Sequence, residues 1–285
     1  MRPAALSAAL RPEEELTGAV RCDVPALGAT VRALARGASA LSTEPFLVIE
    51  RAPAGALRLF CRGELVYETT HEGNLLSCLD LHLDAETPRL LEGRVAFHAA
   101  LAADEGRGIV VAGASMAGKS TLAAALVDAG LAYGTDDVAL VDEDGAVRPC
   151  PRPLRLRPGG AALLGPVSDR FERLSYAVES GATADYLVPR DEATATGPVR
   201  VRVLALLERR QSGFEARRVS AAEATARLLP HRLGEADPAL HLARARALVE
   251  GARERLLLLG GDPRTMAREL GALLGSSLEA RVAAR

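Results

Sequence analysis

Residues 113–120 read Gly113-Ala-Ser-Met-Ala-Gly-Lys-Ser120, and this stretch decides the fold. It matches G-x-x-x-x-G-K-[ST], a pattern in which glycines let successive backbone N–H groups point at phosphate oxygens. The apolar run 108–112 predicts a strand buried on both faces, and 119–129 predicts a helix that Gly130 ends. A strand, a phosphate loop and a helix in this order predict a nucleotide site at the helix N-terminus. A chance glycine-rich turn rarely combines the full pattern with this context.

The lysine of the motif is unusual in this composition. The chain has 35 basic residues, and Lys119 is the only lysine among them. A compact charge on a flexible stem suits contact with the β- and γ-phosphates of ATP, and the Ser120 hydroxyl suits Mg²⁺. The residues expected to bind the nucleotide are Gly113, Ala114, Ser115, Met116, Ala117, Gly118, Lys119, Ser120 and Thr121.

Two adjacent carboxylates, Asp136 and Asp137, follow this helix and precede a strand expected over 138–141. The chain returns toward the phosphate loop here, so the pair can face the γ-phosphate. Two like charges beside one cation have their pKa values pushed apart, which suits a metal-associated acid beside a base. A solvated turn is an equally weighted interpretation of the spacing alone.

Other candidates for polar roles stand elsewhere in the sequence. Asp142 and Glu208 each end an apolar stretch, as the Walker-B carboxylate of an ordinary ATPase does. His98 lies 21 residues before Lys119, in a stretch expected to be a strand over 95–102. A lone histidine in such a stretch is more typical of a protein core than of a catalytic site.

The rest of the pattern predicts two parts, a small α+β module over 1–93 and a larger part over 94–285. Segment 159–198 has the composition of an irregular, mobile loop. The hairpin signal Asp144-Gly145 follows the strand at 138–141. A short apolar run covers 16–22. The other expected strands are 46–51, 56–61, 64–69, 199–208 and 255–259, and the other expected helices are 27–35, 73–83 (ending before Pro88), 220–230, 238–251 and 263–274.

Composition excludes several classes of protein. The 285 residues are 48% hydrophobic and 25% charged, which is typical of a folded chain. The net charge of -2 provides no positive electrostatic field that would attract nucleic acid. No apolar run is long enough to span a membrane, and no signal peptide is evident, so a cytoplasmic location is expected. The four cysteines are scattered, which disfavours a disulfide framework and a zinc site.

One succession of motifs resembles a known family. His98-Ala-Ala, a buried strand, Gly-x-Ser-x-x-Gly-Lys-Ser-Thr, a helix and Asp136-Asp137-Val138 are similar to the catalytic domain of the HPr serine kinase/phosphorylase family, and closest to its divergent HPr-kinase-like branch. The similarity is specific over about 94–148 and weaker in the flanks. It implies an α/β fold with a P-loop kinase domain of the HPr-kinase/PEP-carboxykinase-like type. It also implies ATP and Mg²⁺ as cofactors, and a peptide or protein substrate with an acceptor serine.

The resemblance also implies roles for single residues. Lys119 would bind phosphates, Ser120 would bind Mg²⁺, His98 would be an active-site histidine and Asp137 the base. We expect Asp136 to be the second metal ligand, with Asp142 and Glu208 as alternatives.

The chain departs from the bifunctional members of that family. It has no acidic residue from Pro149 to Ser168, where a metal ligand for phosphorolysis is expected, although Arg155 and Arg157 supply cations. We therefore predict a one-way kinase. The rival functions are a nucleotide-binding regulatory or scaffold protein and a plain P-loop ATPase, and the sequence is compatible with a homo-oligomer.

Overall fold

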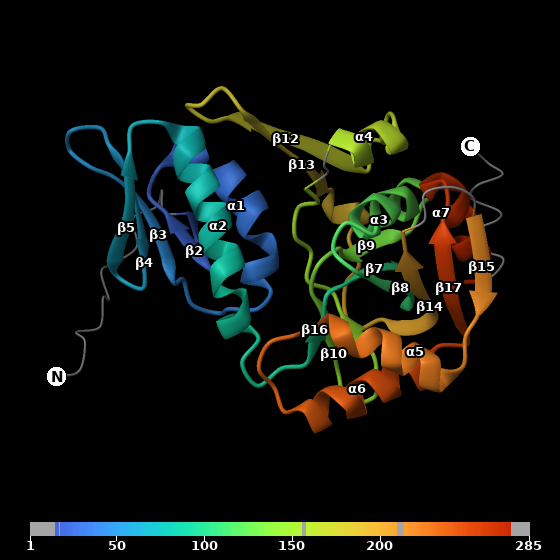
Figure 1. Ribbon diagram of the computed structural model, residues 1–285. Helices are drawn as coiled ribbons and strands as arrows, with labels where there is room; N and C mark the ends of the chain where they lie inside the picture. The colour runs from blue at the N-terminus through green and yellow to red at the C-terminus, as the bar shows by residue number, and fades with distance from the viewer. Residues whose placement is uncertain (1–14, 17, 156–157, 210–213, 275–285) are drawn as a thin grey trace.

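The computed structural model describes residues 15–16, 18–155, 158–209 and 214–274 (Figure 1). The architecture is mixed α/β, with several sheets and helices packed around them. Within the described ranges, no helix combines the length and the apolar composition needed to cross a membrane.

The N-terminal part is a five-stranded sheet whose face toward the rest of the chain is covered by two helices (Figure 1). In spatial order its strands are β1 (Glu15–Leu16), β2 (Val20–Cys22), β3 (Leu47–Arg51), β4 (Leu57–Cys61) and β5 (Glu64–Thr69). The helices are α1 (Pro25–Ser39) and α2 (Glu72–Leu90). Alternate residues such as Leu47 and Ile49 are fully buried with Leu75 and Leu79 of α2 in one core. The three strands predicted between residues 46 and 69 are confirmed.

The prediction that Pro88 lies beyond the second helix is wrong. Helix α2 continues to Leu90 with Pro88 inside it. A proline removes one helical hydrogen bond and is costly in mid-helix, but only the last residues of α2 follow this one. The hydroxyl of Thr87 donates to the carbonyl oxygen of Leu83 at 3.0 Å, which adds a hydrogen bond at the same turn.

The larger part is built on a six-stranded sheet in the order β15-β17-β14-β8-β7-β9. Its three central strands are parallel and the outer three pair antiparallel. The strands are β7 (Ala99–Asp104), β8 (Arg107–Gly113), β9 (Ala132–Thr135), β14 (Arg200–Glu208), β15 (Phe214–Arg218) and β17 (Glu254–Gly260).

Helices cover both faces of this sheet (Figure 1). Ile109 and Val111 of β8 pack on the side of α3 and α7, whereas Val110 and Ala112 pack on the side of α5 and α6. The expected burial of 108–112 on both faces is therefore confirmed. The helices predicted over 119–129, 220–230, 238–251 and 263–274 are also confirmed. Their bounds are α3 (Lys119–Asp128), α5 (Ala221–Leu228), α6 (Pro238–Gly251) and α7 (Pro263–Ala272).

The single strand predicted over 95–102 is interrupted at His98. Before it, β6 (Ala96–Phe97) joins a second sheet of order β11-β10-β6-β16, with β10 (Ala139–Val141), β11 (Val147–Arg148) and β16 (Arg232–Leu233). After it, β7 joins the central sheet. The two halves pair with different neighbours, so the chain changes sheets at His98, whose N–H donates to the carbonyl oxygen of His231 at 2.6 Å.

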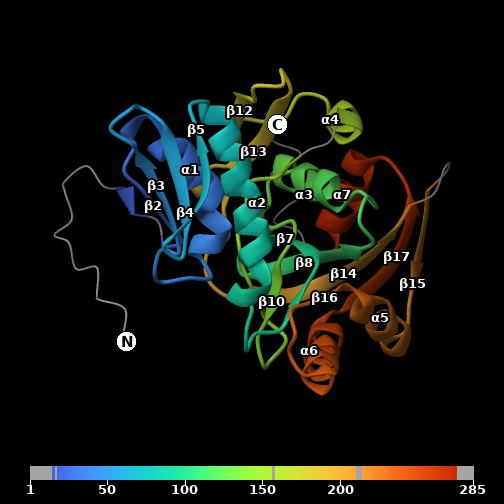
Figure 2. The same cartoon turned by 60° about the vertical axis from the view of Figure 1, so that its left-hand side comes forward.

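The prediction of an irregular segment over 159–198 is also wrong. It contains α4 (Pro158–Leu164) and an antiparallel hairpin of β12 (Phe171–Ala177) and β13 (Thr183–Pro189). Two views show this hairpin running between α2 and the α3–α4 side of the molecule (Figures 1 and 2). Phe171 and Leu187 belong to the core around α3, whereas Tyr186 belongs to the N-terminal core. The hairpin is ordered by these two cores together.

Candidate active site

The phosphate loop connects β8 to α3. A Cβ atom on Gly113 would lie 2.4 Å from the carbonyl oxygen of Leu207, so only glycine allows β14 to approach this closely. Gly118 has φ +106° and Met116 has φ +67°, and these left-handed conformations curl the loop into the first turn of α3. The N-terminus of α3 therefore opens directly from the loop, in the arrangement that binds phosphate groups.

Lys119 folds back over this loop. Its side chain is buried, at 5% exposure, and Nζ donates to the carbonyl oxygens of Gly113 at 2.9 Å and Ala114 at 3.1 Å. Burial lowers the pKa of Lys119, while the charges of Asp137 and Asp136 oppose that shift. The ammonium has three protons, so one donor remains for an anion held in the loop.

A buried threonine forms the turn that carries the two aspartates. The Thr135 hydroxyl accepts hydrogen bonds from the N–H of Asp137 at 3.3 Å and of Val138 at 3.1 Å. This turn follows β9 and precedes β10, and it separates the two carboxylates. Asp136 meets the phosphate-loop side, and Asp137 meets His98.

Asp136 lies against the loop helix. Its side chain is hydrogen-bonded to the Ser120 hydroxyl, and it is almost fully buried, at 8% exposure. Burial is the main reason that its pKa rises to about 6, and the neighbouring Asp137 raises it further. A hydroxyl and a carboxylate side by side are the hard oxygen ligands that Mg²⁺ takes when phosphates and water supply the others. The residues present thus fit Mg²⁺ bound with a nucleotide.

Tyr133 also contacts Asp136. Its hydroxyl lies 3.0 Å from Asp136 Oδ1 and 2.7 Å from the carbonyl oxygen of Arg152. A phenol has one proton, and a carbonyl oxygen can only accept. Both contacts are satisfied together when Asp136 carries a proton, which agrees with its raised pKa.

Among the described residues, no group of three or more His, Cys, Asp or Glu side chains is placed to hold a metal.

Asp137 is held from two sides. Its Oδ1 lies 2.6 Å from His98 Nδ1, and its Oδ2 lies 3.5 Å from Arg152 Nη1. Burial would raise the pKa of Asp137, but the hydrogen bond from His98 and the charges of His98, Arg152 and Lys119 lower it. The carboxylate therefore stays ionised, and at 39% side-chain exposure it is accessible to a bound molecule.

The structure brings five of the expected residues together, namely His98, Lys119, Ser120, Asp136 and Asp137. The alternative acids have other partners. Asp142 accepts from Arg148 Nε at 2.8 Å and lines a separate cavity of about 620 Å³ that no phosphate-loop residue lines. Glu208 is the last residue of β14 and forms an ion pair with Arg227 of α5.

Three residues of this site were not predicted from the sequence. Arg152 and Tyr133 contact the aspartates as described above. The third is His231, whose pKa is lowered by burial and by the charges of Lys119 and His98. Tyr133 lies three residues before Asp136 in a predicted return toward the loop, which was a usable signal. Arg152 is flanked by Pro151 and Pro153, but nothing local relates it to Asp137.

A scan against protein-family models found no match to this chain, and a search of curated proteins found none either. The case for a function therefore rests on the residues and their geometry.

The raised pKa of Asp136 predicts how stability depends on pH in Mg²⁺-free buffer. The native state keeps the proton up to about pH 6, whereas the ordinary value is 3.8. The stabilisation is complete below pH 3.8 and is lost as the pH rises through 6, a loss of about 3 kcal/mol for about two pKa units. Asp136→Asn should remove this loss and be more stable than wild type at pH 7.5. Urea titrations of both proteins from pH 4.5 to 7.5 measure the difference, and parallel curves would contradict the assignment.

Proposed function

We propose that this chain is an ATP- and Mg²⁺-dependent kinase that transfers the γ-phosphoryl group to a hydroxyl, a serine on a peptide or protein. In this proposal the fold is a P-loop kinase domain of the HPr-kinase/PEP-carboxykinase-like type with a small N-terminal module. The protein acts in the cytoplasm, on neither nucleic acid nor membrane. One observation carries the proposal, the division of the Asp pair between Ser120 and His98.

The chain's own residues supply most of this mechanism. The N–H groups of the loop and Lys119 Nζ bind and orient the phosphates, and Ser120 and Asp136 would hold Mg²⁺. When bound, Mg²⁺ would supply charge neutralisation for the phosphates. Asp137 accepts the proton of the acceptor hydroxyl, and His98 keeps the carboxylate oriented through its 2.6 Å contact.

The two carboxylates suit different tasks because of their surroundings. Asp137 is ionised and accessible, so it can take a proton from an incoming hydroxyl. Asp136 is buried beside the Tyr133 hydroxyl, and its pKa of about 6 suits a carboxyl that would exchange its proton for a bound cation. A plain ATPase needs a single acid to order water, and it offers no reason to place an accessible aspartate against a histidine.

The test is labelling with γ-radiolabelled ATP against the products of neighbouring genes, followed by mass-spectrometric mapping of the modified residue. We expect Mg²⁺-dependent label on serine. Phosphate released to water without any acceptor would instead favour an ATPase, and nucleotide binding without turnover would favour a regulatory or scaffold protein.

Two variants separate these outcomes further. Asp142→Asn and Glu208→Gln should leave transfer unchanged, because their carboxylates pair with Arg148 and Arg227 and neither is among the charges that shift the pKa of Lys119. An ATPase that used a Walker-B acid would lose activity in one of them.

A further inference from the structure

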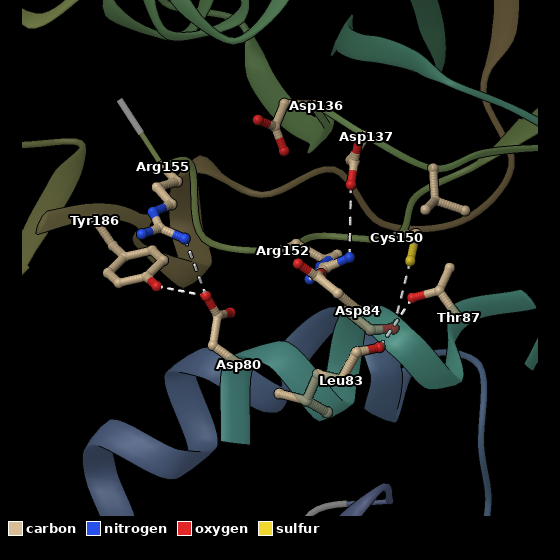
Figure 3. A network of polar contacts seen from close by, with 12 residues as sticks. Asp80, Leu83, Asp84, Thr87, Asp136, Asp137, Cys150, Arg152, Arg155 and Tyr186 are labelled. Carbon is tan, nitrogen blue, oxygen red and sulfur yellow. Dashed lines mark hydrogen bonds and ion pairs between the residues drawn. The ribbon is translucent and has the colours of Figure 1, made fainter. Parts of the chain in front are cut away.

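Arg152 lies between β11 and α4, where it meets two parts of the molecule (Figure 3). Its Nη1 approaches Asp137 Oδ2 at 3.5 Å, and its Nη2 forms an ion pair with Asp84 of α2. The side chain is 15% exposed. One guanidinium thus links the candidate base to a helix of the N-terminal module.

The main chain of Arg152 reaches the other aspartate. Its carbonyl oxygen accepts from the Tyr133 hydroxyl at 2.7 Å, and that hydroxyl lies 3.0 Å from Asp136. Arg152 is therefore connected to both members of the pair, to Asp137 through the side chain and to Asp136 through the backbone.

The Arg152 side chain packs against the N-terminal module. A Cβ atom on Gly37 of α1 would lie 1.9 Å from Arg152 Cγ, so the aliphatic stem rests on bare helix backbone. The Cys150 thiol donates to the Gly37 carbonyl oxygen at 3.3 Å and fixes the same segment two residues earlier. Helix α1 thus receives the stem, and helix α2 receives the charged head.

A second set of polar contacts holds α2 beside Arg152. Tyr186 of β13 donates to Asp80 Oδ2 at 2.6 Å, and Arg155 Nη1 lies 3.7 Å from the same oxygen (Figure 3). Asp80 and Asp84 are one helical turn apart on α2, so these two carboxylates face the segment that carries Arg152 and Arg155.

Electrostatics explains why the arrangement is specific. Without the guanidinium, Asp84 and Asp137 would be two carboxylates turned toward the same space. Burial lowers the pKa of Arg152, but Asp84 and Asp137 raise it, so the charge is retained. A planar guanidinium can contact two carboxylates at once with separate nitrogens, which an ammonium on a thinner stem does less well.

We infer that the N-terminal module is part of the catalytic unit, because Gly37 and Asp84 hold Arg152 as a positioning residue that orients Asp137. This inference rests on the proposed kinase function. It assigns a task to α1 and α2, which supply none of the phosphate-binding residues.

The sharpest test displaces Arg152 from outside the site. Gly37→Ala favours the helix intrinsically, since alanine is the better helix former, yet its methyl group occupies the place of Arg152 Cγ. We expect kcat for γ-phosphate consumption to fall on the order of 10²-fold, the scale of a 1 Å misplacement, with the Kd for Mg·ATP within about twofold of wild type. The matched control is Gly251→Ala at the end of α6, where an added Cβ meets nothing within 4 Å.

A second route uses charge. Arg152→Gln and Asp84→Asn should each lower kcat without weakening Mg·ATP binding by calorimetry, and Arg152→Lys should restore part of the loss. If Asp84 acts through Arg152, adding Asp84→Asn to Arg152→Gln should lower kcat no further. Glu86→Gln removes one charge from the same helix, but its partners are Arg62 and Arg89 within the module, so it serves as the control.

The outcomes distinguish this inference from the proposed function. If wild type fails to bind Mg·ATP, the kinase proposal itself fails. If wild type turns over ATP and Gly37→Ala and Asp84→Asn behave like their controls, the positioning role is overturned and the kinase proposal stands. Circular dichroism checks that each variant folds, and Asp84→Asn still decides the question if Gly37→Ala does not fold.

Discussion

Replacing Lys119 by methionine should reduce nucleotide affinity or turnover by about 10²-fold or more. Among the described residues, Lys119 is the only one of the phosphate loop with a positively charged side chain, and its ammonium is already buried against the carbonyl oxygens of Gly113 and Ala114. Methionine keeps the length of the side chain and removes the charge. The fold should persist, since the variant buries no charge.

Calorimetric titration with Mg·ATP measures the effect, with thermal unfolding as the check on the fold. The matched control is Arg107→Met at the opposite end of β8, where the side chain pairs with Glu105 at 3.5 Å. Wild-type affinity and turnover in Lys119→Met would remove the phosphate-loop assignment and the nucleotide with it.

Asp137→Asn should lower phosphoryl transfer by about 10²- to 10⁴-fold, the usual contribution of a general base. Asparagine keeps the shape of the side chain but cannot accept a proton. The Kd for Mg·ATP should change little, because the proposed metal ligands, Asp136 and Ser120, are unchanged in this variant. Since the pKa of Asp137 is below its ordinary value, transfer should not fall on its account between pH 6 and 8.

Titrating Mg²⁺ separates the two aspartates. Asp136→Asn should raise the Mg²⁺ concentration needed for half-maximal rate, whereas Asp137→Asn should lower the maximal rate alone. The reverse pattern would exchange their roles. Unchanged rates in both variants would show that the two aspartates form an ordinary solvated turn without a catalytic role.

The part of the fold that the sequence predicted best is the part set by local pattern. The run 108–112, the glycines of the loop and the helix after it specify one another within about 20 residues. The helices predicted over 220–230 and 263–274 also begin for a local reason, because the side chains of Ser220 and Asp262 each accept a backbone N–H of the first helical turn.

What the sequence did not predict depends on neighbours distant in the chain. The position of Arg152 is fixed by Gly37 and Asp84, which lie 115 and 68 residues earlier. The break at His98 follows from two sheets that compete for one stretch. The candidate site itself was half predicted, since the Asp pair and Lys119 follow a known spacing, whereas Arg152, Tyr133 and His231 come to it by tertiary packing.

The hairpin of β12 and β13 has a consequence for the order in which the chain acquires its structure. Tyr186 belongs to the N-terminal core and donates to Asp80, yet a ribosome adds it about 100 residues after α2, some 5–20 s later at ordinary rates. The core of the N-terminal module therefore lacks Tyr186 while the ribosome synthesises the central strands. Closing that long loop costs entropy that local contacts do not repay, so the module should reach its stable form only after the hairpin docks. The N-terminal module expressed alone as residues 1–93 should therefore fold poorly.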